Sequence, residues 1–256
     1  MNRIDQLFSL DDRVALVTGA SNGIGRRMAE VLAGAGARVV ILARRQALLD
    51  EVASGICIGG GAAQAIGADL LDLNGIDALH ARVSEAFGPP DILVNAAGVN
   101  LRLPPESYTP EQWNHTLTLN LSVPFFLARA CVPAMKARGD GNIINIASLQ
   151  TTRAFENGIA YGASKGGVGQ LTRAMAEAWS RDGIIVNAIQ PGFFPTELTA
   201  PVFTNPGLAA YHASRTAIGR NGTLEDLDGV TIFLASRACA YITGQVLGVD
   251  GGYTAK

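Results

Sequence analysis

The segment RVALVTGASNGIG, residues 13–25, decides the fold of this chain. Its apolar run from Arg13 to Val17 is typical of a buried strand, and a helical pattern of apolar residues follows the glycines. Glycines between a strand and a helix let the backbone approach a pyrophosphate group, and the helix N-terminus attracts its negative charge. Glycines also form plain turns, but the order strand, turn, helix favours nucleotide binding at Gly19, Gly23 and Gly25.

Strand and helix patterns alternate through the rest of the chain. Short apolar runs are expected to be strands at residues 38–42, 62–68, 91–94, 142–147, 184–189 and 246–249. Continuous apolar strands are typical of a parallel sheet that helices cover on both faces. We therefore predict a single domain over residues 1–256, an α/β doubly wound Rossmann-type sheet of about seven strands. Residues 193–220 combine helical patches with breakers and are expected to form a mobile lid.

A long helix is expected from Pro110 to about Ala137, and it contains Asn120 and Pro124. A proline inside a helix removes a backbone hydrogen bond, so the pattern predicts a kink or a local break there. The next helical pattern begins near Tyr161 and continues to Trp179.

The composition limits the partners of the chain. Charged residues make up 16% and hydrophobic residues 48% of the 256 positions, and the formal net charge is −2. Because the chain has no basic run, this charge argues against a nucleic-acid partner. The high apolar fraction predicts extensive burial, part of it between the subunits of a homo-oligomer.

Cysteines and histidines give no sign of a disulfide or a metal site. The cysteines are an odd set without close pairing, as expected of reduced thiols in a cytoplasmic protein: Cys57, Cys131 and Cys239. The histidines are scattered and predict no metal site: His80, His115 and His212.

The aspartates near the start of the chain are unlike a signal peptide, and no apolar run approaches about 20 residues. We therefore expect a soluble protein that does not contact a membrane.

Tyr161 and Lys165 lie about one turn apart on the same face of a predicted helix. A phenol titrates near ~10 in water, and a lysine ammonium held close favours the phenolate and lowers that pKa. Such a pair can act as a general acid/base on a carbonyl or alcohol oxygen, which the hydroxyl of Ser148 could hold. The alternative is an ordinary tyrosine and lysine on a half-exposed helix, because Tyr-x-x-x-Lys alone is common.

The strand at residues 38–42 leads into Ala43-Arg44-Arg45. An acidic residue at this place usually binds the ribose 2′-hydroxyl of NAD, whereas arginine accommodates the 2′-phosphate of NADP. The acidic residue is missing and Arg44 follows directly, so we expect NADP(H) to be preferred, with Arg45 adding positive field. Use of NAD(H) is also expected, because Asn22 adds no positive charge at the glycine turn. The alternative is two solvated arginines that open the next helix.

The candidate site residues all follow predicted strands. In parallel sheets, ligands bind beyond the carboxyl ends of the strands. This edge would carry the glycine turn, Arg44, Asp69, Asn95, Ser148 and Pro191-Gly192. Because all of these residues would lie at the same edge of the sheet, a shared ligand-binding site explains them better than a separate structural role for each residue.

In this order the residues resemble the short-chain dehydrogenase/reductase family over essentially the whole chain. The matching motifs are Thr18-Gly19-x-x-x-Gly23-x-Gly25, Asp69, Asn95-Ala96-Ala97-Gly98, Asn120, Ser148, Tyr161-x-x-x-Lys165, Asn187 and Pro191-Gly192 followed by Thr196. The resemblance implies an NAD(P)(H)-dependent oxidoreductase that interconverts a ketone and a secondary alcohol by hydride transfer. It also implies a homotetramer.

The resemblance further implies roles for individual residues. Tyr161 would be the acid/base and Ser148 would hold the substrate oxygen. Lys165 would lower the tyrosine pKa and bind the nicotinamide ribose, and Asn120 would hold a water that passes the proton to solvent. Of the cofactor-binding residues, Asn95 is expected near the adenosine ribose. The others are Gly19, Ser21, Asn22, Gly23, Ile24, Gly25, Arg44, Asp69, Leu70, Ala96, Gly98, Tyr161, Lys165, Pro191, Gly192 and Thr196.

The C-terminal part of the chain resembles the branch that holds gluconate 5-dehydrogenases and 3-oxoacyl-carrier-protein reductases. Within it, residues 98–104 (GVNLRLP) and 191–198 (PGFFPTEL) look more like the gluconate enzymes. This resemblance implies a small polar substrate such as a keto sugar acid. Arg102 or Arg153 could pair with its carboxylate, and both could equally point into solvent.

Two rival functions stay open at this stage. A 3-oxoacyl-carrier-protein reductase would need a basic surface patch for the acidic carrier, which could be formed by Arg129, Lys136, Arg138 and Arg173. A nucleotide-binding regulator without catalysis would have no need for Asn120, Ser148, Tyr161 and Lys165 together.

Overall fold

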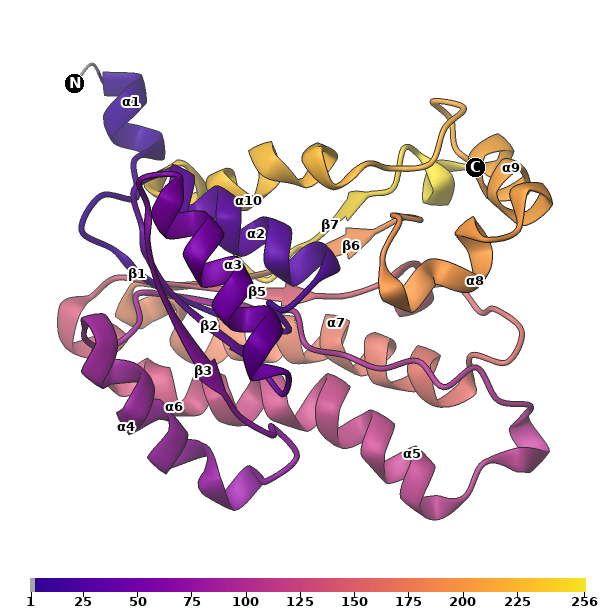
Figure 1. Cartoon of the computed structure of the whole chain (residues 1–256), viewed down its shortest axis with the longest axis horizontal. Coiled ribbons are helices and arrows are strands. Elements are labelled where there is room, and N and C mark those ends of the chain that lie inside the picture. The colour runs from indigo at the N-terminus through magenta and orange to yellow at the C-terminus, as the bar shows by residue number, and fades with distance from the viewer. Residues whose placement is uncertain (1–2) are drawn as a thin grey trace.

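The computed structural model describes residues 3–256. Over these residues the chain forms a parallel sheet of seven strands in the order β3-β2-β1-β4-β5-β6-β7, with helices on both faces (Figure 1). This confirms the predicted doubly wound Rossmann-type fold. The strands are β1 Val14–Thr18, β2 Arg38–Ala43, β3 Ala62–Gly67, β4 Ile92–Asn95, β5 Gly141–Ile146, β6 Ile184–Pro191 and β7 Val246–Val249.

The helices include one that the sequence does not predict, the short α1 at the start of the described chain. A 3₁₀ turn at Leu224–Leu227 leads directly into α10. The helices are α1 Arg3–Phe8, α2 Gly23–Gly34, α3 Gln46–Ile58, α4 Ile76–Phe87, α5 Pro110–Leu117, α6 Val123–Arg138, α7 Ile159–Trp179, α8 Ala200–Phe203, α9 Pro206–Arg215 and α10 Asp228–Ala235.

The core has two halves because each central strand is covered on both faces. Val39 and Ile41 of β2 pack into the half that contains α2, α3 and α10. The alternate residues Val40 and Leu42 pack into the half that contains α4, α6 and α7. Successive side chains of a strand point to opposite faces, so burial on both faces requires an uninterrupted apolar run. This is the physical reason why the strands were predictable.

The chain reverses its winding direction between β1 and β4. Strands β1 to β3 extend the sheet one way and β4 to β7 the other, and Thr18 at the end of β1 lies between Leu42 and Asn95 on its two neighbours. At such a switch point the connections leave toward opposite faces and open a crevice beyond the carboxyl ends. The glycine turn that follows Thr18 enters this crevice directly.

The helical run Pro110–Arg138 contains the predicted break. A π-helical turn, Thr118–Ser122, separates α5 from α6, and Pro124, which has no backbone N–H to donate to the preceding turn, follows it directly. By length and composition alone this run could cross a membrane. However, Leu127, Cys131 and Met135 on one face are fully buried in the domain core, as in a core helix.

Candidate active site

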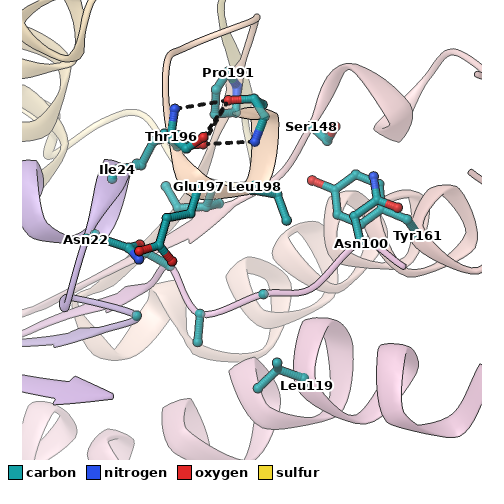
Figure 2. A pocket seen from close by; sticks show the side chains of 18 of the residues that line it. Asn22, Ile24, Asn100, Leu119, Ser148, Tyr161, Pro191, Thr196, Glu197 and Leu198 are labelled. Atoms are coloured by element: carbon teal, nitrogen blue, oxygen red, sulfur yellow. Dashed lines mark hydrogen bonds between the residues drawn. The ribbon is translucent and has the colours of Figure 1, made fainter. Parts of the chain in front are cut away.

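A cavity of about 680 Å³ opens at the carboxyl edge of the sheet (Figure 2). Most of the predicted site residues line it: Gly19, Ser21, Asn22, Gly23, Ile24, Gly25, Arg44, Asp69, Leu70, Ala96, Gly98, Arg102, Ser148, Tyr161, Lys165, Pro191, Gly192 and Thr196. Three predicted residues, Asn95, Asn120 and Arg153, are not part of its lining. The cavity therefore joins the glycine turn at one end to the tyrosine and serine at the other.

The glycine turn has no room for side chains. Gly19 has a φ of +66°, and a Cβ there would lie 2.8 Å from the backbone of Ala97. A Cβ on Gly25 would lie 2.5 Å from the carbonyl oxygen of Gly19. The side chain of Asn22 makes no capping hydrogen bond, so it leaves the first N–H groups of α2 open toward the cavity. This cradle fits the pyrophosphate of a dinucleotide.

The end of β2 carries the two arginines in different environments. Both line the cavity, but Arg45 is paired with Glu197 at 3.0 Å, whereas the structure records no ion pair for Arg44 within residues 3–256. Ala43 occupies the position at the end of β2 where many NAD-binding proteins have a carboxylate that binds the ribose, so this chain has no negative charge there. Asp69, after β3, accepts a hydrogen bond from the backbone N–H of Leu71.

Tyr161 and Lys165 lie on the buried face of α7 and are 7% and 4% exposed. The Lys165 Nζ donates a 2.5 Å hydrogen bond to the carbonyl oxygen of Ile146 and lies 5.7 Å from the centre of the Tyr161 ring. Ser148, which follows β5, faces the same part of the cavity (Figure 2). The predicted acid/base, its lysine and the serine hydroxyl are thus brought together.

The pKa values of this pair differ from the expectation. Burial raises the pKa of Tyr161, and a hydrogen bond with Ser148 and the charge of Arg102 oppose that rise. Burial lowers the pKa of Lys165 to about 8. The pKa of Tyr161 therefore lies above its ordinary value, where a pKa lowered by Lys165 was expected. Burial is the largest cause of both shifts, because it penalises the charged form of each group.

Asn120 lies behind the cavity wall, in the π-helical turn. Its Nδ2 donates to the carbonyl oxygen of Val99 at 2.9 Å, and its Oδ1 accepts from the N–H of Val99 at 2.8 Å. The Nδ2 also donates to Ser164 Oγ at 3.0 Å. A Cβ on Gly98 would lie 3.2 Å from this Oδ1 and 3.8 Å from Lys165 Nζ, so amide and ammonium flank the same small space. Asn120 thereby holds the loop that follows β4.

Asn95 does not line the cavity. Its side chain is buried, and its Nδ2 donates to Asn145 Oδ1 at 2.9 Å and to the carbonyl oxygen of Pro124 at 3.4 Å. Asn145 in turn donates to Thr172 Oγ1 at 3.0 Å. These hydrogen bonds tie β4, β5 and α7 together, whereas the Oδ1 of Asn95 has no hydrogen-bond partner among residues 3–256.

Arg153 does not reach the cavity either. Its Nη2 donates to the carbonyl oxygens of Thr254 and Lys256 at 3.2 and 2.6 Å, so it holds the C-terminal segment.

Arg102 lines the cavity with a φ of +52°, an uncommon backbone conformation for a residue with a side chain. Its Nη2 donates to the carbonyl oxygen of Leu198 at 3.2 Å. Of the two arginines, only Arg102 fits the predicted substrate role.

Sequence reasoning missed an aromatic wall. His212 of α9 stacks on Phe193 with ring centres 3.6 Å apart, and Phe155 and Tyr253 pack around the two rings. His212 and His115 both line the cavity, although they seemed scattered in the sequence. His115 lies on α5 and His212 on α9, so they meet at the cavity only through tertiary packing, which no local motif encodes. Residues 3–256 hold no group of side chains suited to a metal ion.

Similarities to known proteins agree with this geometry. A family model described as enoyl-(acyl carrier protein) reductase matches residues 19–254. Gluconate 5-dehydrogenase of Gluconobacter oxydans (strain 621H) is 40% identical over 248 residues, covering 97% of each chain. The crystal structure of a gluconate 5-dehydrogenase from Burkholderia cenocepacia J2315, in complex with NADP and tartrate, is similar with a TM-score of 0.94 at 37% identity, covering 99% of this chain and 100% of that chain. NAD-dependent glycerol dehydrogenase of Listeria innocua serovar 6a is 35% identical over 252 residues, covering 98% of each chain.

The fold, the cavity and these similarities define an NAD(P)-dependent oxidoreductase that acts on hydroxyl and keto groups. The chain belongs to the short-chain dehydrogenase/reductase family.

Proposed function

We propose that this enzyme interconverts a small keto sugar acid and the corresponding secondary alcohol, with NADP(H) as the preferred cofactor. The observation that carries the proposal is the meeting of Ser148, Tyr161 and Lys165 in one cavity with the guanidinium of Arg102. Burial raises the pKa of Tyr161, and the charge of Arg102 partly opposes that rise. A guanidinium on the same cavity can hold a substrate carboxylate while the phenol faces a carbonyl of the same small molecule.

The chain's own residues manage the proton. The bound nicotinamide supplies or accepts the hydride. In the reductive direction Tyr161 donates its proton to the substrate oxygen, and in the oxidative direction it takes that proton back. The hydroxyl of Ser148 donates a hydrogen bond to the same oxygen. Lys165 and Asn120 flank the space beside Gly98, where a water could carry the proton onward.

The substrate end of the cavity supports a polar, compact substrate. The stacked rings of His212 and Phe193 form one wall, and Arg102 lines the same cavity. Burial lowers the pKa of His212, and the charge of Arg102 adds to that effect. The relatives with the same architecture include gluconate 5-dehydrogenases. A carboxylate on Arg102 and hydroxyls against the histidine edge would orient a sugar acid toward Tyr161.

The basic patch needed for an acyl carrier protein is largely neutralised. Three of its four cations are paired with aspartates on neighbouring elements: Arg129 with Asp77 at 3.1 Å, Lys136 with Asp182 at 2.7 Å and Arg138 with Asp91 at 2.9 Å. The remaining one, Arg173, donates to Gln170. Because paired charges project little field, this face is poorly suited to an acidic carrier helix.

The preference for NADP rests on the end of β2. Ala43 offers no carboxylate to repel a 2′-phosphate, and Arg44 faces the cavity without a competing ion pair among residues 3–256. One relative is NAD-dependent and another binds NADP, so the preference is expected to be moderate.

We also propose a cytoplasmic homotetramer with a movable lid over residues 193–220. Exposed apolar side chains support association, among them Phe125 on α6 and Tyr241 before β7. Light scattering coupled to size-exclusion chromatography tests the tetramer.

A panel of ketones and sugar acids, assayed in both directions with both cofactors, tests the function. Highest kcat/KM on a keto sugar acid with NADPH would support it. Efficient reduction of 3-oxoacyl thioesters, with no activity on keto sugar acids, would reject it.

A further inference from the structure

The segment 193–220 places a carboxylate on one of the two arginines at the cofactor end of the cavity. The Nη1 and Nη2 of Arg45 donate to Oε1 and Oε2 of Glu197 at 3.2 and 3.0 Å. The same Nη2 lies 3.4 Å from Ser21 Oγ in the glycine turn. This two-pronged geometry is the one with which a guanidinium binds a phosphate. The protein's own carboxylate therefore already fills the anion-binding side of Arg45.

The two consecutive arginines therefore differ in how available they are to a bound phosphate. Arg44 and Arg45 both line the cavity, but within residues 3–256 the structure records an ion pair only for Arg45. Glu197 lines the cavity as well, as does Asn22 of the glycine turn (Figure 2). A 2′-phosphate that approaches Arg45 would meet this carboxylate first.

Glu197 also connects the cofactor end to the lid. It directly follows Thr196, whose methyl group would lie 3.0 Å from a Cβ on Gly23. The ion pair thus joins the lid segment to the end of β2, and the contact with Ser21 joins both to the glycine turn. Arg45 and Glu197 are about half exposed, so the pair is weak enough for a bound anion to replace.

We propose that Glu197 is a cofactor-specificity residue, whose carboxylate competes with the 2′-phosphate of NADP for Arg45. The proposal rests on the assignment of the cofactor end of the cavity to the dinucleotide. NADP would displace Glu197 and free the lid from β2, whereas NAD, which has no 2′-phosphate, would leave the pair in place. The carboxylate thereby reduces the preference for NADP that two free arginines would give.

The test compares Glu197→Gln with the wild type. Glutamine has the shape of glutamate but no charge, so it should no longer compete with the 2′-phosphate for Arg45. The ratio of kcat/KM for NADP over NAD is therefore expected to rise about three- to tenfold. Glu30→Gln is the matched control, because Glu30 pairs with Arg26 at 2.8 Å and does not line the cavity. An unchanged ratio in Glu197→Gln, or an equal rise in Glu30→Gln, would overturn the proposal.

Titration calorimetry with 2′,5′-ADP and 5′-AMP separates phosphate recognition from turnover. Glu197→Gln should tighten binding of 2′,5′-ADP relative to 5′-AMP, and the gain should shrink in an Arg45→Gln background. A gain that persists in full without Arg45 would overturn the proposed competition. If the wild type prefers NAD, the proposed cofactor is wrong, and a shift toward NADP in Glu197→Gln would still support the role of Glu197.

Discussion

Replacing Lys165 by methionine should change how stability depends on pH. Burial lowers the pKa of Lys165 to about 8, from an ordinary value of 10.5. Between these two values the unfolded chain binds more protons than the folded one, so this residue makes stability rise with pH. Below the folded pKa the ammonium is present in both states and its burial destabilises the fold. Methionine has a similar length and carries no charge, so it removes this penalty.

The size of the effect follows from the displacement of the pKa. One pKa unit corresponds to about 1.4 kcal/mol, and the fall from 10.5 to about 8 therefore gives a penalty of about 3 kcal/mol near neutral pH. At about pH 10 most of the penalty has disappeared. The stability difference between Lys165→Met and the wild type should thus shrink by about 2–3 kcal/mol between about pH 7 and about pH 10.

Urea unfolding of both proteins at the two pH values, at one fixed protein concentration, measures this difference. Other titrating groups are common to both proteins and cancel. The hydrogen bond from Lys165 to Ile146 is lost at both pH values and does not mimic the change. If the stability difference between the two proteins is the same at both pH values within about 0.5 kcal/mol, the pKa of Lys165 is not lowered by burial.

Three further substitutions test separate parts of the site. Arg44→Ala should lower the ratio of kcat/KM for NADP over NAD by about 10- to 150-fold, and an unchanged ratio would remove Arg44 from the 2′-phosphate site. Ser148→Ala should lower kcat by about 10²–10³, because the hydroxyl that holds the reacting oxygen is lost, and a loss under about threefold would exclude that role. Arg102→Ala should raise KM for a keto sugar acid by about tenfold or more, while Arg153→Ala, which alters only the C-terminal segment, should not. Equal effects of the two arginine substitutions would argue against a carboxylate on Arg102.

Much of the fold was predictable because its signals are local. The central strands are mostly apolar, since helices cover both faces of the sheet, and Gly19 and Gly25 stand where no side chain fits. The topology then brings every strand end to one edge. For this reason Ser148, Tyr161 and Lys165 could be expected to meet before their distances were known.

Side-chain directions and long-range partners were not predictable. Asn95 ends β4 as expected, but its amide donates to the buried partners Asn145 and Pro124, and it does not line the cavity. Arg153 follows a site segment, yet its partners are carbonyl groups more than a hundred positions later. The sequence presents Arg44 and Arg45 alike, and only the distant Glu197 distinguishes them. The pKa of Tyr161 likewise depends on burial, which a Tyr-x-x-x-Lys motif does not specify.

The central claim is that Tyr161 passes the proton in a hydride transfer to a keto sugar acid. Its most direct test is the single-turnover rate of NADPH oxidation by a keto sugar acid in the wild type and in Tyr161→Phe, with NADPH affinity measured in parallel. We predict a rate about 10²–10⁴ times lower in the variant, with NADPH affinity nearly unchanged, because only the proton donor is removed. A variant that keeps more than about a tenth of the wild-type rate would contradict the account.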